Sequence, residues 1–257
     1  MAEQLITSRD NPRLVAARRV RDGRDKSNIF VEGRRLAEEA VRSGLKIVEC
    51  FVSDEFDARE LTDSIAEPVS RMPARIFRTI ADTDSPQGII LIAERPRMRP
   101  FRKTLLPLTV FLNEINNPAN LGAILRTAEG AGVGHVVLSK GSTDPNSPKA
   151  LRASMGSAFR ISIGEGETLT EAVDVCRERG GIATGVDING SQSYTDIDWS
   201  QPRMLVFGSE AHGLSDHEVA LLDDTIRIPM APDVESLNLA VSAGIVLFEA
   251  RRQLTSR

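Results

Sequence analysis

The side chains best placed to do chemistry lie in a polar loop and the helix predicted to follow it, residues 113–132 (NEINNPANLGAILRTAEGAG). A helix start offers free backbone N–H groups to an anion, and Asn120 stands near this start. Arg126, six residues later, would add a positive charge. Two structural roles compete with anion binding. Asn120 fits a plain N-cap, and Arg126 fits a surface ion pair with Glu129, worth ~0.3 kcal/mol.

Two further loops place polar side chains after apolar runs. Residues 208–213 (GSEAHG) contain two glycines, which permit a backbone to approach a ligand closely. Glu210 between them fits either a functional carboxylate or a simple solvated turn. The third loop begins at Ile228 and leads to a long apolar helix predicted to start near Ser236, which fits a helix cap. Ser236 and Asn238 at the head of a buried helix are costly unless they are hydrogen-bonded.

The rest of the sequence disfavours several other kinds of site. Cys50, Cys176 and three histidines are too few for a disulfide framework or a Cys/His metal cage, so we expect no metal. Neither a G-x-x-x-x-G-K-S/T phosphate loop nor a G-x-S-x-G nucleophile elbow occurs. The run EGAGVG at residues 129–134 follows a predicted helix and lacks the G-x-G-x-x-G spacing, which indicates a helix C-cap and turn.

The composition is that of an ordinary globular protein. The chain has 257 residues, of which 41% are hydrophobic and 26% charged, so wholesale disorder and fibrous architectures are disfavoured. No apolar run reaches the length needed to cross a bilayer, and the start MAEQLITSRD lacks a secretory apolar core. We therefore expect a cytoplasmic protein.

Residues 94–107 (ERPRMRPFRKTLLP) divide the chain, because three prolines and five basic residues stand there between two apolar runs. We predict a small α/β domain at residues 1–97, a linker at 98–107 and a second α/β domain at 108–257. In the first domain the pattern predicts helices at 12–21 and 34–41, strands at 29–31 and 47–52, and two further short αβ units that end at 88–93.

The second domain alternates strands and helices, which predicts a mainly parallel sheet covered on both faces. Ligands bind such sheets beyond the carboxyl ends of the strands, so we expect the three polar loops to close into one cleft there. The predicted strands are 109–112, 135–138, 160–163, 181–186, 205–208 and 225–228, and the predicted helices are 121–131, 149–155, 169–179 and 237–254.

The net charge of −4 hides an asymmetry between the two halves of the chain. Residues 1–103 carry a net charge of +3 and residues 104–257 one of −7. The first 35 residues hold nine basic side chains against five acidic ones. Such a surface attracts phosphate, although a merely solvated charged face explains the same pattern.

Several motifs occur together in the second domain. They are N-P-x-N-x-G-x-x-x-R-T-A at residues 117–128, S-P-K-A-L-R-A-S-M-G-S at 147–157, G-S-E-x-x-G-L-S at 208–215, and I-P-M at 228–230 leading to S-L-N at 236–238. In this order they resemble the SpoU (TrmH) family of RNA ribose methyltransferases in the SPOUT superfamily. In the first domain, S-R-D-N-P at 8–12, F-V-E-G at 30–33 and P-Q-G-I at 86–89 resemble the family's ribosomal-protein L30-like substrate-binding module. The likeness covers nearly the whole chain.

The resemblance implies a trefoil-knotted α/β domain, in which the carboxy-terminal segment threads through a loop, and a homodimer with its active site near the interface. It also implies S-adenosylmethionine as cofactor and RNA as substrate. The cofactor contacts that it implies are Gly208, Ser209, Gly213, Ile228, Met230 and Leu237. The catalytic residues that it implies are Asn120, Arg126, Glu210, Ser236 and Asn238.

Methyl transfer to a ribose 2′-hydroxyl requires help for the hydroxyl proton as the new bond forms. Arg126 matches the family arginine that activates this hydroxyl, and because a guanidinium stays protonated we favour an electrostatic role over proton abstraction. Asn120 and Asn238 are expected to position the ribose and phosphate. Glu210 is expected to orient Arg126 or the loop, and Ser236 to hydrogen-bond within the same cluster.

The amino-terminal module favours 23S ribosomal RNA as the target, with a tRNA 2′-O-methyltransferase as the alternative. A non-catalytic RNA-binding or ribosome-assembly factor with the same fold is a second class of function, disfavoured by the intact polar residues. A generic doubly wound nucleotide-binding enzyme is disfavoured by the absence of glycine fingerprints.

RNA binding by this chain is expected to depend steeply on salt. Aromatic residues are only 4% of the chain, so phosphate contacts rather than base stacking should dominate. The expected contacts lie in the basic segments 9–35 and 95–103, with Arg9, Arg13, Arg18, Arg19 and Arg34 foremost. If five arginines contact phosphates, affinity measured by fluorescence anisotropy should fall by roughly 10²-fold between about 50 and 200 mM salt. An affinity that does not change with salt would contradict this expectation.

Overall fold

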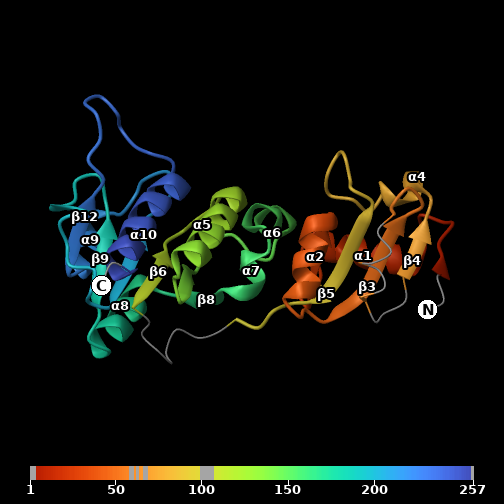
Figure 1. Ribbon diagram of the computed structural model, residues 1–257, viewed down its shortest axis with the longest axis horizontal. Helices are drawn as coiled ribbons and strands as arrows, with labels where there is room; N and C mark the ends of the chain where they lie inside the picture. The colour runs from red at the N-terminus through yellow and green to blue at the C-terminus, as the bar shows by residue number, and fades with distance from the viewer. Residues whose placement is uncertain (1–3, 58–60, 62–63, 66–68, 99–106, 256–257) are drawn as a thin grey trace. The chain divides into compact units, whose positions relative to one another are not determined.

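The computed structural model describes residues 4–57, 61, 64–65, 69–98 and 107–255, which form two compact units (Figure 1). Unit 1 comprises Met1–Arg97 together with Pro145–Phe159, and unit 2 comprises Met98–Asp144 together with Arg160–Arg257. Most of the predicted linker, residues 99–106, lies outside the described residues. We describe each unit by itself.

Unit 1 is built on a five-stranded sheet with the strand order β1-β4-β3-β5-β2. Strand β5 pairs antiparallel with β2 and β3, whereas β4 pairs parallel with β3 and β1. The strands are β1 (Gln4–Leu5), β2 (Asn28–Glu32), β3 (Ile47–Ser53), β4 (Val69–Met72) and β5 (Ile89–Glu94). The helices within residues 1–97 are α1 (Pro12–Arg21), α2 (Arg34–Arg42) and α4 (Ala74–Phe77). These elements confirm the predicted helices at 12–21 and 34–41 and the strands at 29–31 and 47–52.

Unit 1 has its own hydrophobic core. Leu14 and Val20 of α1 pack with Phe30, Phe51 and Phe77, and all five are less than 9% exposed. Helix α1 begins where Pro12 can occupy the first turn, and the Asn11 side chain accepts a hydrogen bond from the backbone N–H of Arg13 at 2.9 Å. A domain of this size therefore buries enough apolar surface to hold its sheet against its helices.

Pro145–Phe159 is grouped with unit 1, although the sequence assigned it to the second domain with the rest of residues 108–257. Helix α6 (Pro148–Ser154) packs on β2, and Arg152 pairs with Asp82 at 2.7 Å. The buried Glu32 carboxylate lies 4.0 Å from Arg152 and accepts the backbone N–H of Asp82 at 2.8 Å. Contacts that are distant in sequence therefore decide where this segment belongs.

Unit 2 is built on a seven-stranded sheet in which every strand pairing is parallel. The strand order is β10-β12-β9-β11-β6-β7-β8, so the predicted parallel sheet is confirmed. The strands are β6 (Leu108–Leu112), β7 (His135–Ser139), β8 (Ser162–Glu167), β9 (Ile182–Val186), β10 (Gln192–Ser193), β11 (Arg203–Phe207) and β12 (Asp224–Arg227). The central strands β6 and β11 are buried along their whole length, as a strand covered on both faces must be.

The helices of unit 2 pack on this sheet and on each other. Helix α8 (Leu169–Glu178) packs on β9 and β11, and α5 (Pro118–Ala131) packs against α10 (Leu239–Thr255) (Figure 1). The short helix α9 (Asp216–Leu221) follows β11. Helix α7 (Ser157–Arg160) precedes β8, and all but its last residue belong to unit 1. Gly132 ends α5 with a φ of 80°, which confirms that the EGAGVG run is a helix C-cap.

Several boundaries differ from the sequence prediction, and short elements such as α9 were not expected. The strand predicted at 160–163 begins only at Ser162, because Arg160 ends α7. The helix predicted from residue 237 begins at Leu239. Helix α9 was not predicted, since none of its residues is buried and it has no apolar periodicity to reveal it.

No helix in the described part of the chain is both long and apolar enough to cross a bilayer. The threading of the carboxy-terminal segment through a loop stays a prediction from the family resemblance.

A buried ion pair links β11 to β12 across β9, which lies between them in the sheet of unit 2. Arg203 in β11 is 5% exposed and donates hydrogen bonds to the Asp224 carboxylate at 2.9 Å and to Thr184 Oγ1 at 2.6 Å. The second carboxylate oxygen of Asp224 is buried without a hydrogen-bond partner. Removal of the guanidinium would therefore leave a largely uncompensated charge inside the sheet.

We expect Arg203→Met to lower the free energy of unfolding of unit 2 by about 3 kcal/mol. Urea denaturation followed by Trp199 fluorescence measures this change, because Trp199 is the only tryptophan of the chain and is 1% exposed. The matched control is Arg177→Met, which removes a more exposed pair with Asp223 and should cost less than about 1 kcal/mol. Equal losses in both variants would show that burial of the Arg203–Asp224 pair adds nothing to its contribution.

Candidate functional site

The polar loops of unit 2 surround one cavity of about 570 Å³ at the carboxyl end of the parallel sheet. The loops after β9, β11 and β12 contribute to it, as do the first turns of α5 and α10. The residues that line the cavity are Asn120, 186–189, 207–214, Ile228, Met230, 236–239 and Ser242. The three segments singled out in the sequence therefore converge, as expected for a sheet of this kind.

The loop after β11 is folded tightly around two glycines. Ser209 and Gly213 exchange backbone hydrogen bonds of 3.1 and 3.0 Å. A Cβ on residue 208 would lie 2.1 Å from the carbonyl carbon and oxygen of Gly213, so only glycine fits there. Gly213 has a φ of 64°, which also favours glycine. This loop therefore presents backbone to the cavity rather than bulky side chains.

Glu210 links this loop to the segment that precedes α5. Its carboxylate accepts the backbone N–H groups of Asn116 and Asn117, both at 3.1 Å, and the side-chain amide of Asn120 at 3.4 Å. Hydrogen bonds to an ionised acceptor are among the stronger ones in proteins. Of the two roles expected for Glu210, the structure places it beside the loop and not beside Arg126.

Two asparagines join α5 to α10. The side-chain amide of Asn238 donates to the side-chain oxygen of Asn120 at 3.2 Å. The Asn238 oxygen also accepts the backbone N–H groups of Ala240 and Val241, at 2.9 and 3.3 Å, and thereby caps α10. Asn120 and Asn238 therefore stand side by side at the rim of the cavity, with their amides oriented by the helix starts.

Neither of the capping roles considered as alternatives for Asn120 and Ser236 occurs. Asn117, not Asn120, caps α5, since its side chain accepts the N–H of Ala119 at 2.9 Å. Asn238, not Ser236, caps α10. Each helix starts at a different residue from the one predicted, which leaves Asn120 free to reach across to Asn238. Ser236 is exposed, lines the cavity and makes no hydrogen bond among the described residues.

Arg126 is exposed on α5 and does not line the cavity. The ion pair that we considered between Arg126 and Glu129 does not form. Glu129 pairs instead with Arg160, whose Nη2 lies 2.9 Å from a Glu129 carboxylate oxygen. Within the described residues, Arg126 makes no ion pair and no hydrogen bond with its side chain. Four of the five predicted catalytic residues thus meet in one protomer, and the guanidinium stands apart.

All six predicted cofactor contacts line the cavity: Gly208, Ser209, Gly213, Ile228, Met230 and Leu237. Sequence reasoning missed the loop after β9, residues 186–189, and His212 in the loop after β11. Asp187 in the first of these accepts the backbone N–H of Asn189 at 2.7 Å. The predicted strand at 181–186 could have indicated residues 186–189, since the carboxyl ends of all parallel strands lie at the same edge of the sheet.

The arginines predicted to contact RNA belong to unit 1, and three of them are engaged within it. Arg13 pairs with Glu49 and stands 5.8 Å from the centre of the Phe51 ring. Arg18 donates to the Arg9 carbonyl at 2.5 Å, and Arg34 pairs with Glu38 at 3.0 Å. Arg9 is exposed and lies 3.9 Å from the Asp10 carboxylate, and Arg19 is also exposed. Their role in RNA binding stays a prediction.

The cysteines are unsuited to nucleophilic chemistry. Burial raises the pKa of the Cys50 thiol to about 12 and that of Cys176 to about 11, so both stay protonated near neutral pH. No group of three or more His, Cys, Asp or Glu side chains in the described residues is arranged to hold a metal ion. The chemistry of the cavity therefore rests on backbone groups, the amides of Asn120 and Asn238, and the side chains of Asp187, Glu210 and His212.

Comparison with known protein families gives two matches. The SpoU rRNA Methylase family matches residues 107–248, which include every lining residue of the cavity, and an MRM3-like substrate binding domain matches residues 6–91.

Similar proteins cover nearly the same length. The chain is 30% identical to the 23S rRNA (guanosine(2553)-2′-O)-methyltransferase RlmP of Bacillus subtilis, over 89% of this chain and 90% of that protein. It is 31% identical to the mitochondrial rRNA methyltransferase 3 of Homo sapiens, over 95% of this chain and 71% of that protein. The crystal structure of an AdoMet-bound rRNA methyltransferase from Sinorhizobium meliloti superposes with a TM-score of 0.86, at 31% identity and 98% coverage of both chains.

We expect Glu210→Ala to loosen the segment before α5. The backbone N–H groups of Asn116 and Asn117 would lose their charged acceptor, so amide exchange there should speed up about tenfold or more. Hydrogen–deuterium exchange followed by mass spectrometry measures this in a peptide covering residues 113–120. Asp216→Asn, at an exposed position of α9 outside the cavity, is the control and should leave this peptide unchanged. Unchanged exchange in Glu210→Ala would mean that the carboxylate does not hold the segment.

Proposed function

This chain belongs to the SpoU rRNA methylase family, and on that premise we propose that it methylates a ribose 2′-hydroxyl of 23S ribosomal RNA. The observation that carries the proposal is the convergence of the family's three motifs on one cavity. In support of 23S rRNA, the chain aligns along most of its length with RlmP, whose name gives that substrate. We also propose a cytoplasmic location, where ribosomal RNA of this kind is made.

S-adenosylmethionine is the methyl donor, and it is bound in the related structure from Sinorhizobium meliloti. The cavity suits it, because the tight loop around Gly208 exposes backbone groups while Ile228 and Leu237 supply apolar surface. The donor supplies an electrophilic methyl group when bound. In our proposal the backbone at Gly208, Ser209 and Gly213 holds the donor and shields it from water.

Asn120 and Asn238 are proposed to position the nucleotide that is methylated. The Asn120 side-chain oxygen accepts from Asn238, and its amide N–H₂ donates to Glu210. These two hydrogen bonds fix both asparagine side chains at the cavity rim. Groups held in this way need no reorganisation when a ribose arrives, which is how positioning lowers a barrier. Glu210 then acts as a positioning residue through the segment it holds.

No Arg or Lys is among the described residues that line the cavity. We propose that a second copy of the chain supplies the positive charge. Val241 and Phe248 on α10 are each 51% exposed and, seven residues apart, share one face of the helix. Phe248 lies next to Gly130 of α5, 3.6 Å from the position of an added Cβ, and α5 also carries the exposed Arg126. Large apolar side chains exposed together are typical of an interface.

In a twofold dimer through α5 and α10, Arg126 of each protomer would approach the cavity of the other. A guanidinium there would stabilise the charge on the 2′-oxygen as the methyl group is transferred from sulfur to oxygen and the hydroxyl proton passes to solvent water, and the guanidinium would stay protonated throughout. This arrangement explains why an exposed arginine without a partner occurs within the family motif.

The decisive experiment measures transfer of a labelled methyl group from S-adenosylmethionine to ribosomal RNA by purified protein. We expect Arg126→Ala and Asn238→Ala each to lower the rate by about 10²-fold or more, with donor binding by calorimetry nearly unchanged for Arg126→Ala. If Arg126 acts across the interface, a purified heterodimer of these two variants should regain about half of the wild-type rate, because one of its two sites is intact.

Three results would count against parts of this proposal. No recovery in the heterodimer would place Arg126 in its own protomer's reaction or outside catalysis. Donor binding without methyl transfer to any ribosomal or transfer RNA would favour a non-catalytic RNA-binding factor. Transfer to transfer RNA alone would replace the proposed substrate and leave the site unchanged.

A further inference from the structure

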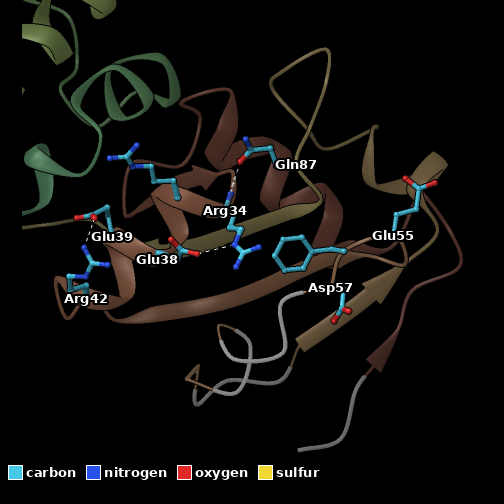
Figure 2. Close-up of a pocket in the computed structure, with 9 residues that line it drawn as sticks. Arg34, Glu38, Glu39, Arg42, Glu55, Asp57 and Gln87 are labelled. Atoms are coloured by element: carbon cyan, nitrogen blue, oxygen red, sulfur yellow. Dashed lines mark hydrogen bonds and ion pairs between the residues drawn. The ribbon is translucent and has the colours of Figure 1, made fainter.

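A second concave region lies in unit 1, far in sequence from the motifs of the cavity in unit 2. A hollow of about 540 Å³ lies between α2 and the loop after β3, and Figure 2 shows Arg34, Glu38 and Arg42 along one side, with Glu55 and Asp57 across from them. A neighbouring hollow of about 460 Å³ shares Glu55, Phe56 and Gln87 with the first. Volumes of this size suit a small-molecule or single-nucleotide ligand.

Two glycines shape this region, and they belong to the F-V-E-G and P-Q-G-I motifs of the sequence. Gly33 has a φ of 101°, and a Cβ there would lie 3.0 Å from the side-chain oxygen of Gln87. Gly88 has a φ of 84°, and a Cβ there would lie 3.0 Å from the Cβ of Phe56. Both positions therefore suit only glycine. The absence of a Cβ lets Gln87 lie close to Gly33 and Phe56 lie close to Gly88.

Gln87 is oriented by α2. Its side-chain oxygen accepts the backbone N–H of Arg34 at 2.9 Å, as Figure 2 shows, and takes the capping role that Gly33 cannot fill. The oxygen is thus used, and the amide nitrogen of the exposed side chain is left with two N–H donors. The cap of α2 therefore comes from a loop 53 residues away. A Ser or Asp at residue 33 would have capped the helix locally.

The two sides of the hollow differ in chemistry. Arg34 and Arg42 are paired with Glu38 and Glu39, yet their side chains are 60% and 71% exposed. Across from them, the exposed carboxylates of Glu55 and Asp57 make no hydrogen bond or ion pair within the described part of the chain. Phe56, a half-buried aromatic residue, lines both hollows.

This combination does not fit a uniformly anionic surface such as the outside of an RNA helix, because the two carboxylates would repel phosphates. It fits one nucleotide that is unstacked from its neighbours. The phosphate would face the arginines, the base would stack on an aromatic ring, and amino groups on the edge of the base would donate to the carboxylates. Cytosine, adenine and guanine carry such an exocyclic amino group, and uracil does not.

We propose that this hollow of unit 1 binds a single unstacked nucleotide of the RNA substrate whose base bears an exocyclic amino group. The inference rests on the proposed function, since it assigns the ligand to the RNA that is methylated. It adds a recognition site on the unit that matches a substrate-binding domain. Phe56 supplies the stacking surface, Gln87 a donor, and Glu55 with Asp57 the selection of the base.

The test compares two labelled single strands of about ten nucleotides, oligocytidine and oligouridine, which differ in the base edge and form little structure. Binding to the full chain is measured by fluorescence anisotropy. We expect oligocytidine to bind at least about fivefold more tightly than oligouridine, and Glu55→Gln with Asp57→Asn to reduce this ratio to within about twofold. Phe56→Leu, which keeps apolar packing beside Gly88, should weaken binding of both strands about tenfold.

The control is Asp22→Asn with Glu94→Gln, which removes the same two charges from unit 1 outside the hollow. It should strengthen binding of both strands alike and keep their ratio. A wild-type ratio near one, an unchanged ratio in Glu55→Gln with Asp57→Asn, or unchanged binding by Phe56→Leu would each overturn the inference. Methyl transfer by the wild-type protein is measured in parallel, so that loss of the nucleotide site is told apart from failure of the proposed function. Thermal melting confirms that each variant is folded.

Discussion

The site in unit 2 depends on one chain of hydrogen bonds that runs from Glu210 through Asn120 to Asn238. Glu210 holds the loop after β11 to the segment before α5, and Asn238 both caps α10 and reaches back to Asn120. Three parts of the chain are thereby fixed around one cavity, and Asn120 lies 90 residues from Glu210 and 118 residues from Asn238. Because the acceptor is a carboxylate and the donors are backbone and amide N–H groups, the network holds position without adding a bulky group to the cavity.

The parallel sheet makes this network possible. Strands β9, β11, β6 and β12 all point their carboxyl ends to one edge, so each following loop opens in the same direction. At Gly208 the backbone of the loop lies so close to Gly213 that a side chain at residue 208 would not fit. A binding surface made mainly of backbone suits a ligand recognised by shape, and it leaves polar side chains for the reacting partner.

Unit 1 uses a similar principle on a different sheet. Gly33 and Gly88 adopt left-handed backbone conformations that let Gln87 and Phe56 pack closely, and the side chains gathered there carry both signs of charge. Of the five arginines expected to contact RNA, Arg13 and Arg34 pair with glutamates, so net charge overstates how much of this unit is free to attract phosphate.

The sequence by itself determined the class of fold, the positions of most helices and strands, and the loops that carry the site. These features depend on apolar periodicity, capping residues and glycines within a few positions of one another, as at the helix from Pro12 and the cap at Gly132. Only the tertiary structure decided that Asn117 and Asn238 are the caps, that Glu129 pairs with Arg160, that Arg126 stands outside the cavity, and that Pro145–Phe159 packs with unit 1. The reason is physical. Each of these outcomes depends on which hydrogen-bond or ion-pair partners folding brings together. Asn120, for example, bonds to Glu210 and Asn238, which lie 90 and 118 residues away. A local sequence pattern contains no information about partners so far along the chain.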